Sequence, residues 1–365
     1  MDLETKLELI SRPPAEEVIT LGDLRHLLKT ESRPIAYNGW EPSGMVHLGT
    51  GLICSYKMRD LIEAGVRFKA YLASYHALIN HKLGGDIELI RTAAKHFRHS
   101  WIACGVPSDK VEFVWAEEEY EDLDYWTKVL TVANQMSIAR ARRTLEIMGR
   151  RKIDASKVSD LIYTPMQVAD IFHFGVRICQ LGMDQRKANM VARELGEKLG
   201  YWKPVCVHHH LLQGLSAPAV WPLPTDPVTR KESIISAKMS KSNPKTCIWI
   251  YDQPEEIERK MRSAFCPERE VEYNPVLDLT KHIIFRERME FIIERPAKFG
   301  GGRMEFQSPT ELEDAYRKGD VHPSDLKSAV AEALTDILEP VRRYFSQNRE
   351  AKETLLTLSK VTITR

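Results

Sequence analysis

Short apolar runs alternate with longer amphipathic stretches along most of the chain. The short runs have the length and composition of buried strands and lie at residues 34–37, 68–73, 111–115 and 205–208. The longer stretches carry apolar side chains three or four positions apart and predict helices at residues 47–64, 86–104 and 187–199. Because strands and helices alternate in this order, we expect an α/β fold with a parallel sheet.

The pattern differs at the two ends of the chain. Residues 1–32 have the spacing of charged helices, with Glu16 and Glu17 on an exposed face. From about residue 254 onward the strand signals fade, and an apolar stripe at helical spacing runs from Leu326 to Val341. The pattern therefore predicts a sheet-containing domain followed by a mainly α-helical C-terminal domain.

Length and composition narrow the class of protein. The chain of 365 residues is long enough for two compact domains, and its 43% hydrophobic residues exclude a disordered protein. With a net charge of +1, any RNA contact has to use local clusters of Lys and Arg. The six dispersed cysteines form no Cys-x-x-Cys pair, which is typical of a reducing compartment. Since neither a signal peptide nor an apolar stretch of bilayer length is found, we expect a cytoplasmic protein without membrane contact.

A candidate anion site follows the first predicted strand. Residues 39–50 contain Gly39 and Gly49 and lead into a predicted helix. Free backbone N–H groups at a helix N-terminus attract phosphate, and glycine lets a nucleotide approach the backbone closely. His47 offers a donor for a phosphate oxygen. Because such strand–glycine–helix passages are common, a turn with a core histidine is the alternative interpretation.

A second candidate element has the sequence KMSKS and lies at residues 238–242. It places Lys238 and Lys241, with two hydroxyl groups, in a segment that ends before Pro244. Mobile ammonium groups can follow the charge that collects on pyrophosphate as it leaves ATP. A solvated basic loop is the alternative, but HLGT at residues 47–50 stands upstream of it in the order that a split phosphate site requires.

Together these two segments resemble the signature motifs of the class I aminoacyl-tRNA synthetases. The resemblance implies a Rossmann-type catalytic domain, an aminoacyl-adenylate formed from ATP with Mg²⁺, and transfer of the amino acid to tRNA. It implies as ATP-binding residues Gly39, His47, Gly49, Ser240 and Lys241. It implies as catalytic residues His47, Lys238 and Lys241, the lysines stabilising pyrophosphate as it departs. The family's first motif often ends in histidine, so Thr50 at that position predicts a modest loss of phosphate contact.

Polar residues in apolar surroundings mark a candidate amino-acid pocket. Tyr163, Gln167 and Asp170 share roughly one face of a predicted helix. Gln167 and Asp170 stand among apolar side chains, where an unpartnered polar group is costly to bury. Asp170 could instead cap a turn and Gln167 could satisfy a backbone group, and the spacing alone does not decide between these interpretations.

On these residues the chain resembles the tyrosyl-tRNA synthetases of the archaeal and eukaryotic cytosolic type over nearly its whole length. The resemblance assigns the ammonium end of L-tyrosine to Tyr163, Gln167 and Gln185, and the phenol to Tyr37 and Asp170. A hydroxyl bound there satisfies groups that phenylalanine would leave unpaired. No editing domain is therefore expected.

Contacts with tRNA are expected in both predicted domains. The basic cluster at residues 140–143, followed by residues 150–152, has the composition of a solvated helix face. By the resemblance, contacts with the first base pair of tRNA(Tyr) come from Arg143, Arg186 and Lys187. In the C-terminal part, His322 and Asp325 match the family's anticodon-reading turn, although Asp325 also suits the first turn of a helix.

Three further features depart from the family pattern. Ser74 stands where some relatives carry an acidic residue, which predicts rearranged polar contacts. Residues 216–237 are longer than in short relatives and are candidates for shielding the lysine segment. Ile283 aligns with an aromatic residue that stacks on the anticodon in some relatives, so that stacking contact is in doubt here.

The resemblance also predicts the domain organisation and the partners. Residues 1–252 would form the catalytic domain, with a dimer-forming connective segment at about 116–160, and residues 253–365 a helical anticodon-binding domain. The expected partners are tRNA(Tyr), L-tyrosine, ATP and a second copy of the chain in a homodimer. Adjacent imidazoles at residues 208–210 converge poorly on one ion, so no structural metal or tightly bound cofactor is expected, and His208 is a candidate lining of the adenylate pocket. The alternatives are a tryptophanyl-tRNA synthetase and a catalytically silent RNA-binding relative.

Overall fold

The protein is described by a computed structural model, which covers residues 1–148, 157–241, 243–295, 297 and 301–361. The chain divides into two compact units. The first unit contains residues 1–45, 54–210 and 353–365, and the second contains residues 46–53 and 211–352. The functional division that we expect at residue 252 stays a prediction.

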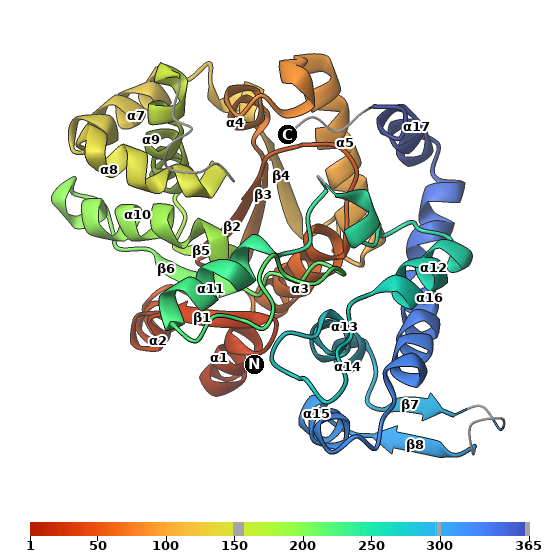
Figure 1. The fold of residues 1–365 in the computed structure, drawn as a ribbon. Coiled ribbons are helices and arrows are strands. Elements are labelled where there is room, and N and C mark those ends of the chain that lie inside the picture. The colour runs from red at the N-terminus through yellow and green to blue at the C-terminus, as the bar shows by residue number, and fades with distance from the viewer. Residues whose placement is uncertain (149–156, 242, 296, 298–300, 362–365) are drawn as a thin grey trace. The chain divides into compact units, whose positions relative to one another are not determined.

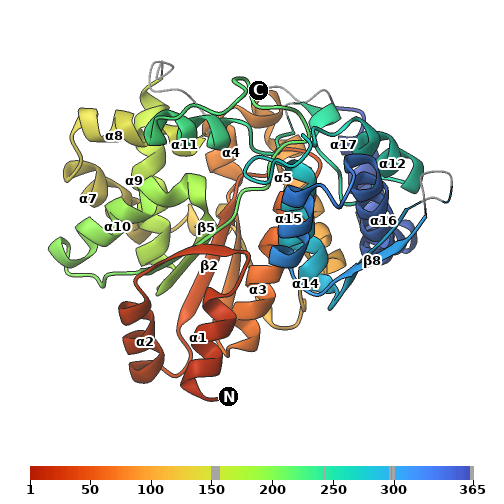
Figure 2. The same cartoon turned by 60° about the horizontal axis from the view of Figure 1, so that its bottom comes forward.

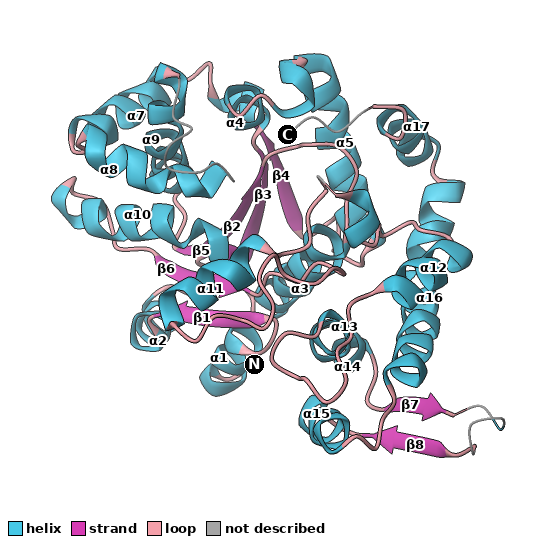
Figure 3. Ribbon diagram, in the orientation of Figure 1, coloured by secondary structure: helices cyan, strands magenta, loops and turns pink. Residues whose placement is uncertain are grey.

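A six-stranded sheet forms the centre of the first unit (Figure 1, Figure 3). Its strand order is β1-β6-β5-β2-β3-β4, and all neighbours are parallel except the antiparallel pair β1 and β6. The strands are β1 (Ala15–Ile19), β2 (Ile35–Trp40), β3 (Arg67–Leu72), β4 (Val111–Trp115), β5 (Ile178–Gly182) and β6 (Val205–His209). The prediction of an α/β fold with a parallel sheet is confirmed.

The expectation of an entirely helical N-terminal segment is wrong. Helix α1 (Leu3–Ser11) and helix α2 (Leu21–Thr30) are both present, but β1 lies between them. The side chains of Asp2 and Thr20 cap the two helices by accepting from the backbone N–H groups of Thr5 and Asp23. β1 is held by hydrogen bonds to β6, a partner far along the chain, so the local pattern of this short edge strand does not reveal it.

Helices cover both faces of this sheet. Besides α1 and α2, the helices that lie entirely within this unit are α3 (Cys54–Glu63), α4 (Ser74–Ile79), α5 (Ile87–Ala103), α6 (Ala116–Glu119), α7 (Leu123–Asn134), α8 (Ile138–Thr144), α9 (Val158–His173) and α10 (Arg186–Lys198). Figures 1 and 2 show α7 to α10 gathered on one side of the sheet and α3 and α5 on the other. Short 3₁₀ turns lie at Lys82–Gly85, Leu145–Met148 and Met183–Gln185. The predicted helices at 86–104 and 187–199 are confirmed.

The second unit is mainly helical. A π-helical turn (Gly49–Ile53) begins the helix that was expected from residue 47 and passes into α3 of the first unit. The other elements are α11 (Pro227–Ser236), a 3₁₀ turn (Pro244–Thr246), α12 (Pro254–Ser263), α13 (Pro275–Leu279), a π-helical turn (Thr280–Ile284), α14 (Phe285–Glu287), β7 (Phe291–Glu294), β8 (Arg303–Phe306), α15 (Pro309–Lys318) and α16 (Pro323–Gln347). The antiparallel pair β7 and β8 was not expected from the sequence. Helix α16 confirms the apolar stripe, since Leu326, Val330, Leu334, Leu338 and Val341 are all buried.

The last helix, α17 (Arg349–Leu358), passes from the second unit into the first. Among the helices that the structure describes, none is long and apolar enough to cross a membrane.

Candidate active site

The five residues expected to hold the amino acid come together in the first unit. Tyr37 lies on β2, and Tyr163, Gln167 and Asp170 lie on α9. Gln185 ends the 3₁₀ turn that follows β5, the neighbour of β2 in the sheet. In an open parallel sheet, this region beyond the carboxyl ends of the strands is the usual place for a ligand. Gln167 Nε2 donates to Gln185 Oε1 at 3.3 Å, so the side chains of Gln167 and Gln185 are in contact.

Buried polar atoms without a hydrogen-bond partner gather around these residues. Among the described residues, they include the hydroxyls of Tyr37 and Tyr71 and Oε1 of Gln167. Tyr37 is 1% exposed and Tyr71 is 1% exposed, so water does not satisfy their hydroxyls from outside. Because an unpartnered buried polar group costs free energy, their concentration here favours a polar ligand at this place.

Asp170 is the buried carboxyl of the pocket. It is 2% exposed, and Oδ1 accepts a hydrogen bond of 2.9 Å from the hydroxyl of Tyr125 on α7. Nε2 of His76 lies 3.5 Å from Oδ2. Burial raises the pKa of Asp170 well above its usual range, and it lowers the pKa of His76 to about 3. Sequence reasoning missed Tyr125 and the contact of His76, since neither stands in a motif.

Glu41 is a further residue of the pocket that no sequence signal revealed. Its carboxylate accepts hydrogen bonds from the hydroxyl of Tyr163 (2.7 Å) and from Nδ2 of Asn80 (2.9 Å). Lys82 lies 3.5 Å from the same carboxylate. Burial and the charge of Glu41 raise the pKa of Tyr163 well above its usual value. Glu41 directly follows β2, which extends three residues beyond the strand predicted at 34–37. A position just after a strand is the signal that could have found it.

Gly39 lies near the end of β2, opposite Tyr71 of β3. A Cβ atom at this position would come within 3.2 Å of the Tyr37 ring and 3.4 Å of the Tyr71 ring. Glycine therefore allows the two aromatic rings to pack closely against the backbone.

The two phosphate motifs meet within the second unit. His47 is half-buried, and burial with the charges of Lys241 and Lys238 lowers its pKa to about 3. The backbone N–H of Gly49 lies 3.1 Å from His47 Nδ1, and the hydroxyl of Thr50 lies 3.3 Å from Nε2. If Nδ1 accepts from Gly49, the neutral ring carries its proton on Nε2. A Cβ atom on Gly49 would stand 3.0 Å from the His47 ring, so the ring would have to shift to admit a larger residue there.

A short backbone pairing holds the His47 segment. His47 forms an isolated antiparallel bridge with Trp249, and the N–H of Leu48 donates to the carbonyl of Ile248 at 3.0 Å. Trp249 in turn is fixed by Asp252, whose Oδ2 accepts from the Trp249 N–H and from the ammonium of buried Lys260. The first motif is therefore anchored to the segment that follows the lysine motif.

The lysine motif is anchored by Met239. Met239 is 4% exposed, and its backbone N–H donates to the carbonyl of Leu212 at 2.6 Å. Lys238 pairs with Gln213 in an isolated bridge. Ser240 and Lys241 follow, while Ser242 lies outside the described residues.

Residues 216–237 lead directly into this motif. They contain α11, which ends at Ser236. Trp221 packs edge-on against Phe265, with ring centroids 5.1 Å apart, and lies near Tyr273. The shielding role that we expect for this segment stays a prediction.

Three of the expected tRNA contacts line one surface pocket of about 360 Å³ in the first unit. The pocket is lined by Arg140, Arg143, Thr144, Arg186, Lys187 and Met190. Nε of Arg186 is held by the carboxylate of Glu17 at 2.9 Å. Arg140 is likewise paired with Glu194, so at least two of the four basic side chains that line the pocket are in ion pairs. The four basic groups make the pocket a candidate contact for phosphate. The second part of the basic cluster, residues 150–152, lies outside the described residues.

The expected anticodon residues lie at the start of α16 in the second unit. His322 caps this helix, since its Nδ1 accepts from the Ser324 N–H at 3.2 Å. Asp325 is 7% exposed and accepts from Nε of Arg295 at 2.9 Å. His322 and Asp325 therefore each have a hydrogen-bond partner within the protein, in addition to the anticodon contact that we expect for them. Ile283 is 0% exposed, so it does not offer a surface for stacking on a base.

The histidines of residues 208–210 do not converge. His208 lies between Glu17 (2.8 Å) and Asn189 (2.9 Å), whereas His209 contacts Gln180 (2.6 Å). His208 thus has protein partners on both nitrogens, and its role beside the adenylate stays a prediction.

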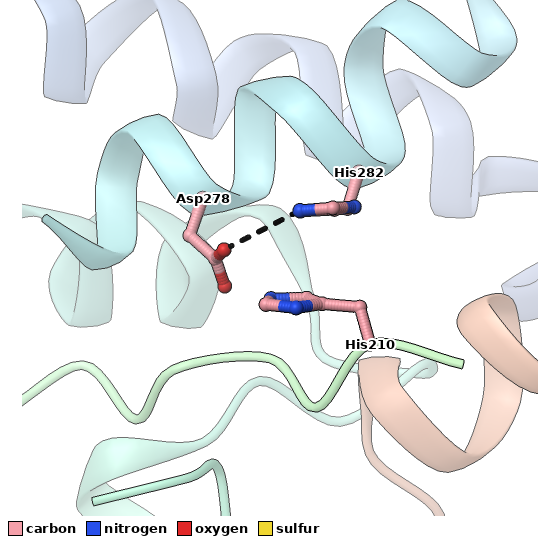
Figure 4. Close-up of side chains that lie close together, drawn as sticks. All are labelled: His210, Asp278 and His282. Atoms are coloured by element: carbon pink, nitrogen blue, oxygen red, sulfur yellow. Dashed lines mark ion pairs between the residues drawn. The ribbon is translucent and has the colours of Figure 1, made fainter. Parts of the chain in front are cut away.

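Two groups of carboxylates and histidines have partners of their own. Asp278 and His282 form an ion pair of 3.7 Å in the second unit, drawn as a dashed line in Figure 4. Asp278 also accepts a hydrogen bond from the N–H of Gln213. In the first unit, Asp122 and Asp124 lie near His173, with Lys128 paired to Asp124. Asp278 and Asp124 therefore have protein partners, and the expected absence of a structural metal stays a prediction.

The chain is similar to known synthetases over its whole length. Residues 29–339 match the family described as class I tRNA synthetases (W and Y). The tyrosine–tRNA ligase of Thermococcus kodakarensis is 46% identical over 380 residues and covers 100% of both chains. That of Pyrococcus abyssi is 46% identical over 377 residues and covers 99% of this chain and 100% of its own.

Solved structures agree with this similarity. The crystal structure of the Pyrococcus horikoshii tyrosyl-tRNA synthetase complexed with L-tyrosine superposes with a TM-score of 0.92 at 45% identity, covering 98% of this chain and 100% of that one. The tryptophanyl-tRNA synthetase of Aeropyrum pernix has a TM-score of 0.67 at 16% identity, which shows a shared fold alone.

Proposed function

The chain belongs to the class I tRNA synthetases of the tryptophan and tyrosine type, and from this premise we infer that it is a tyrosine–tRNA ligase. It activates L-tyrosine with ATP and transfers the tyrosyl group to the 3′ end of tRNA(Tyr). The observation that carries the choice of amino acid is the buried pocket in which Asp170 and the unpartnered Tyr37 hydroxyl stand together with Gln167. A tryptophan side chain has no hydroxyl to satisfy these groups.

The pocket distinguishes the two ends of the substrate. Tyr37 and Asp170 bind the phenol, because one offers a hydroxyl and the other a carboxyl oxygen. Tyr163, Gln167 and Gln185 hold the ammonium end, because their hydroxyl and amide oxygens can accept from an ammonium group. A site built to bond a hydroxyl rejects an analogue that lacks it, because its own buried groups are then left unpaired.

Activation is a displacement at the α-phosphorus of ATP, which enters as its Mg²⁺ complex. A carboxylate oxygen of tyrosine forms the new bond to phosphorus, and the bond to the leaving pyrophosphate breaks. The ammonium groups of Lys238 and Lys241 stabilise the charge on pyrophosphate, and neutral His47 offers its Nε2–H to a phosphate oxygen. Gly39, Gly49 and Ser240 complete the ATP-binding set, with two glycines that let the nucleotide approach the backbone.

Transfer requires contacts with both ends of tRNA(Tyr). Arg143, Arg186 and Lys187 bind near the first base pair, where phosphate attraction supplies affinity. His322 and Asp325 contact the anticodon. Substitution of Arg186 by alanine should weaken charging of tRNA without changing tyrosine activation; equal loss of both would argue against this assignment.

We further propose that the active form is a homodimer in the cytoplasm. The segment at about 116–160 includes the exposed apolar side chains Leu123 (79% exposed), Leu130 (62%) and Ile138 (64%). Apolar side chains grouped on neighbouring helices are better covered by a second copy of the chain than by water. Sedimentation should show a dimer that Leu130→Glu converts to monomer, whereas a monomeric wild-type chain would refute the proposal.

The experiment that tests the function is ATP–pyrophosphate exchange with each amino acid in turn, followed by charging of tRNA. Exchange should depend on tyrosine, and the product should be tyrosyl-tRNA. Exchange supported by tryptophan alone would favour a tryptophanyl-tRNA synthetase. Absence of exchange with every amino acid would favour a catalytically silent RNA-binding relative.

A further inference from the structure

Tyr125 on α7 presents its hydroxyl to the buried carboxyl of Asp170. Tyr125 is 0% exposed, and its hydroxyl donates to Oδ1 of Asp170 at 2.9 Å. We propose that Tyr125 is a positioning residue for the discrimination of tyrosine from phenylalanine: its O–H holds Asp170 in the form and orientation that accept the substrate phenol. This inference rests on the proposed function, because it takes tyrosine as the substrate of the pocket.

The hydrogen-bond directions follow from the number of protons. The Tyr125 hydroxyl has one proton, and two oxygens lie within reach: Asp170 Oδ1 at 2.9 Å and the Tyr120 hydroxyl at 3.4 Å. The shorter contact, to a carboxyl oxygen, is the stronger one. The Tyr120 hydroxyl lies 3.3 Å from His76 Nδ1 and can donate there, which leaves the neutral His76 with its proton on Nε2, facing Asp170 Oδ2 at 3.5 Å.

The groups around Asp170 otherwise favour its neutral form. The titratable side chains that face it are those of Tyr37 (β2), Tyr71 (β3), His76 (α4), Glu119 (α6), Tyr120, Tyr125 (α7) and Tyr163 (α9). Burial raises the pKa of the Asp170 carboxyl, the hydrogen bond from Tyr125 lowers it, and the charge of Glu119 raises it again. Tyr125 is thus the group that works against protonation of Asp170. A protonated carboxyl would present an O–H donor beside the substrate phenol and would be a weaker acceptor for it.

Substitution of Tyr125 by phenylalanine tests this role, because it removes the hydroxyl and keeps the ring that stacks on Tyr120. In ATP–pyrophosphate exchange, kcat/KM for tyrosine should fall by roughly 10- to 100-fold, the worth of one hydrogen bond to a charged group. The value for phenylalanine should stay unchanged, so the tyrosine-to-phenylalanine ratio falls by the same factor. The ratio in the variant should rise with pH, because a higher pH favours the ionised form of Asp170 that the Tyr125 hydrogen bond otherwise stabilises.

Tyr75→Phe is the matched control. The Tyr75 ring also packs on Tyr120, with centroids 4.6 Å apart, and it makes no hydrogen bond to Asp170 among the described contacts. This control should keep the wild-type ratio. A ratio in Tyr125→Phe equal to that of the control at every pH would overturn the inference.

A variant that keeps a hydrogen-bond donor at position 125 separates the loss of the donor from a general disturbance of folding. Tyr125→His keeps a ring N–H and should hold the ratio above that of Tyr125→Leu; equal ratios in these two variants would likewise overturn the inference. Tyrosine-dependent exchange by the wild-type chain is measured in the same series. Its absence would defeat the proposed function, whereas its presence with an unchanged Tyr125→Phe ratio would defeat this inference alone.

Discussion

The hydroxyl of Tyr163 donates a hydrogen bond of 2.7 Å to Oε1 of Glu41, and this bond joins α9 to the segment after β2. The contact places a carboxylate beside one of the groups that we assign to the ammonium end of tyrosine. An ammonium group bound at Tyr163 would therefore have an anion close by, which the sequence motifs alone did not supply.

Substitution of Glu41 by glutamine should weaken tyrosine binding. The amide keeps the size of the side chain and removes its charge, so a charge-assisted contact with the ammonium is lost. We expect KM for tyrosine to rise by roughly 10- to 100-fold, with KM for ATP changed far less. Steady-state exchange kinetics with each substrate varied separately provide the check, and an unchanged KM for tyrosine would exclude Glu41 from the ammonium site.

Lys241→Ala should slow activation rather than binding. Removal of a group that stabilises charge developing in the transition state typically lowers kcat by about 10²- to 10³-fold. KM for tyrosine should stay near the wild-type value, because Lys241 acts on pyrophosphate. Lys245→Ala is the matched control, since Lys245 is exposed and lies just beyond the motif. Equal effects of the two substitutions would mean that Lys241 has no specific role.

Removal of the buried ion pair between Lys57 and Asp60 on α3 should lower the unfolding free energy of the protein. Both side chains are 0% exposed and lie 2.9 Å apart, and Lys57 also donates to the carbonyls of Leu9 and Arg12. Asp60→Ala leaves this ammonium without its carboxylate, which should cost about 3–5 kcal/mol of unfolding free energy.

Urea unfolding measures this loss. Glu4→Ala, which breaks the exposed pair with Arg25, serves as the control and should leave the unfolding midpoint unchanged. If Asp60→Ala had as little effect as the control, the structural role of the buried pair would be refuted.

His209 should make stability depend on pH in the acid range. Its folded-state pKa is lowered to about 3, chiefly by burial, whereas an unfolded histidine titrates near 6.5. Below about pH 6.5 His209 binds a proton in the unfolded chain but not in the folded chain. Its contribution to the unfolding free energy is therefore complete above that pH and is lost as the pH falls towards 3.

Between pH 7.5 and 5.5 this single group should remove about 1.4 kcal/mol of unfolding free energy. Urea unfolding at the two pH values measures the change, and His209→Gln should show a correspondingly smaller loss. A variant with the same pH dependence as the wild type would show that His209 does not remain neutral in the folded chain.

The sequence predicted β2, β3, β4 and β6, but it predicted neither β5, a central strand of the sheet, nor the edge strand β1. Strands β2 to β4 and the helices between them are long or apolar enough to be recognised locally. β1 was missed because it is a short edge strand with Glu16 and Glu17 in it, and its pairing with β6 is a long-range contact. The hairpin of β7 and β8 was missed for the same reason, since each strand has only four residues.

The same limit applies to the site. Residues 47–50 and 238–242 were found as motifs. Helical spacing marked Tyr163, Gln167 and Asp170 without deciding their role, which came from the family resemblance. Glu41, His76 and Tyr125 come from three separate elements, and only the folded chain brings them beside the helix that carries Asp170 and Tyr163. No local pattern marks such residues, because their chemistry depends on neighbours distant in sequence.

The most direct test of the tyrosine pocket is tyrosine- and phenylalanine-dependent ATP–pyrophosphate exchange by the Asp170→Ala variant beside the wild type. We expect the variant to lose most of its activity with tyrosine and its discrimination against phenylalanine, because the carboxyl that receives the phenol is gone. Discrimination against phenylalanine at the wild-type level would contradict the assignment of Asp170 to the substrate hydroxyl.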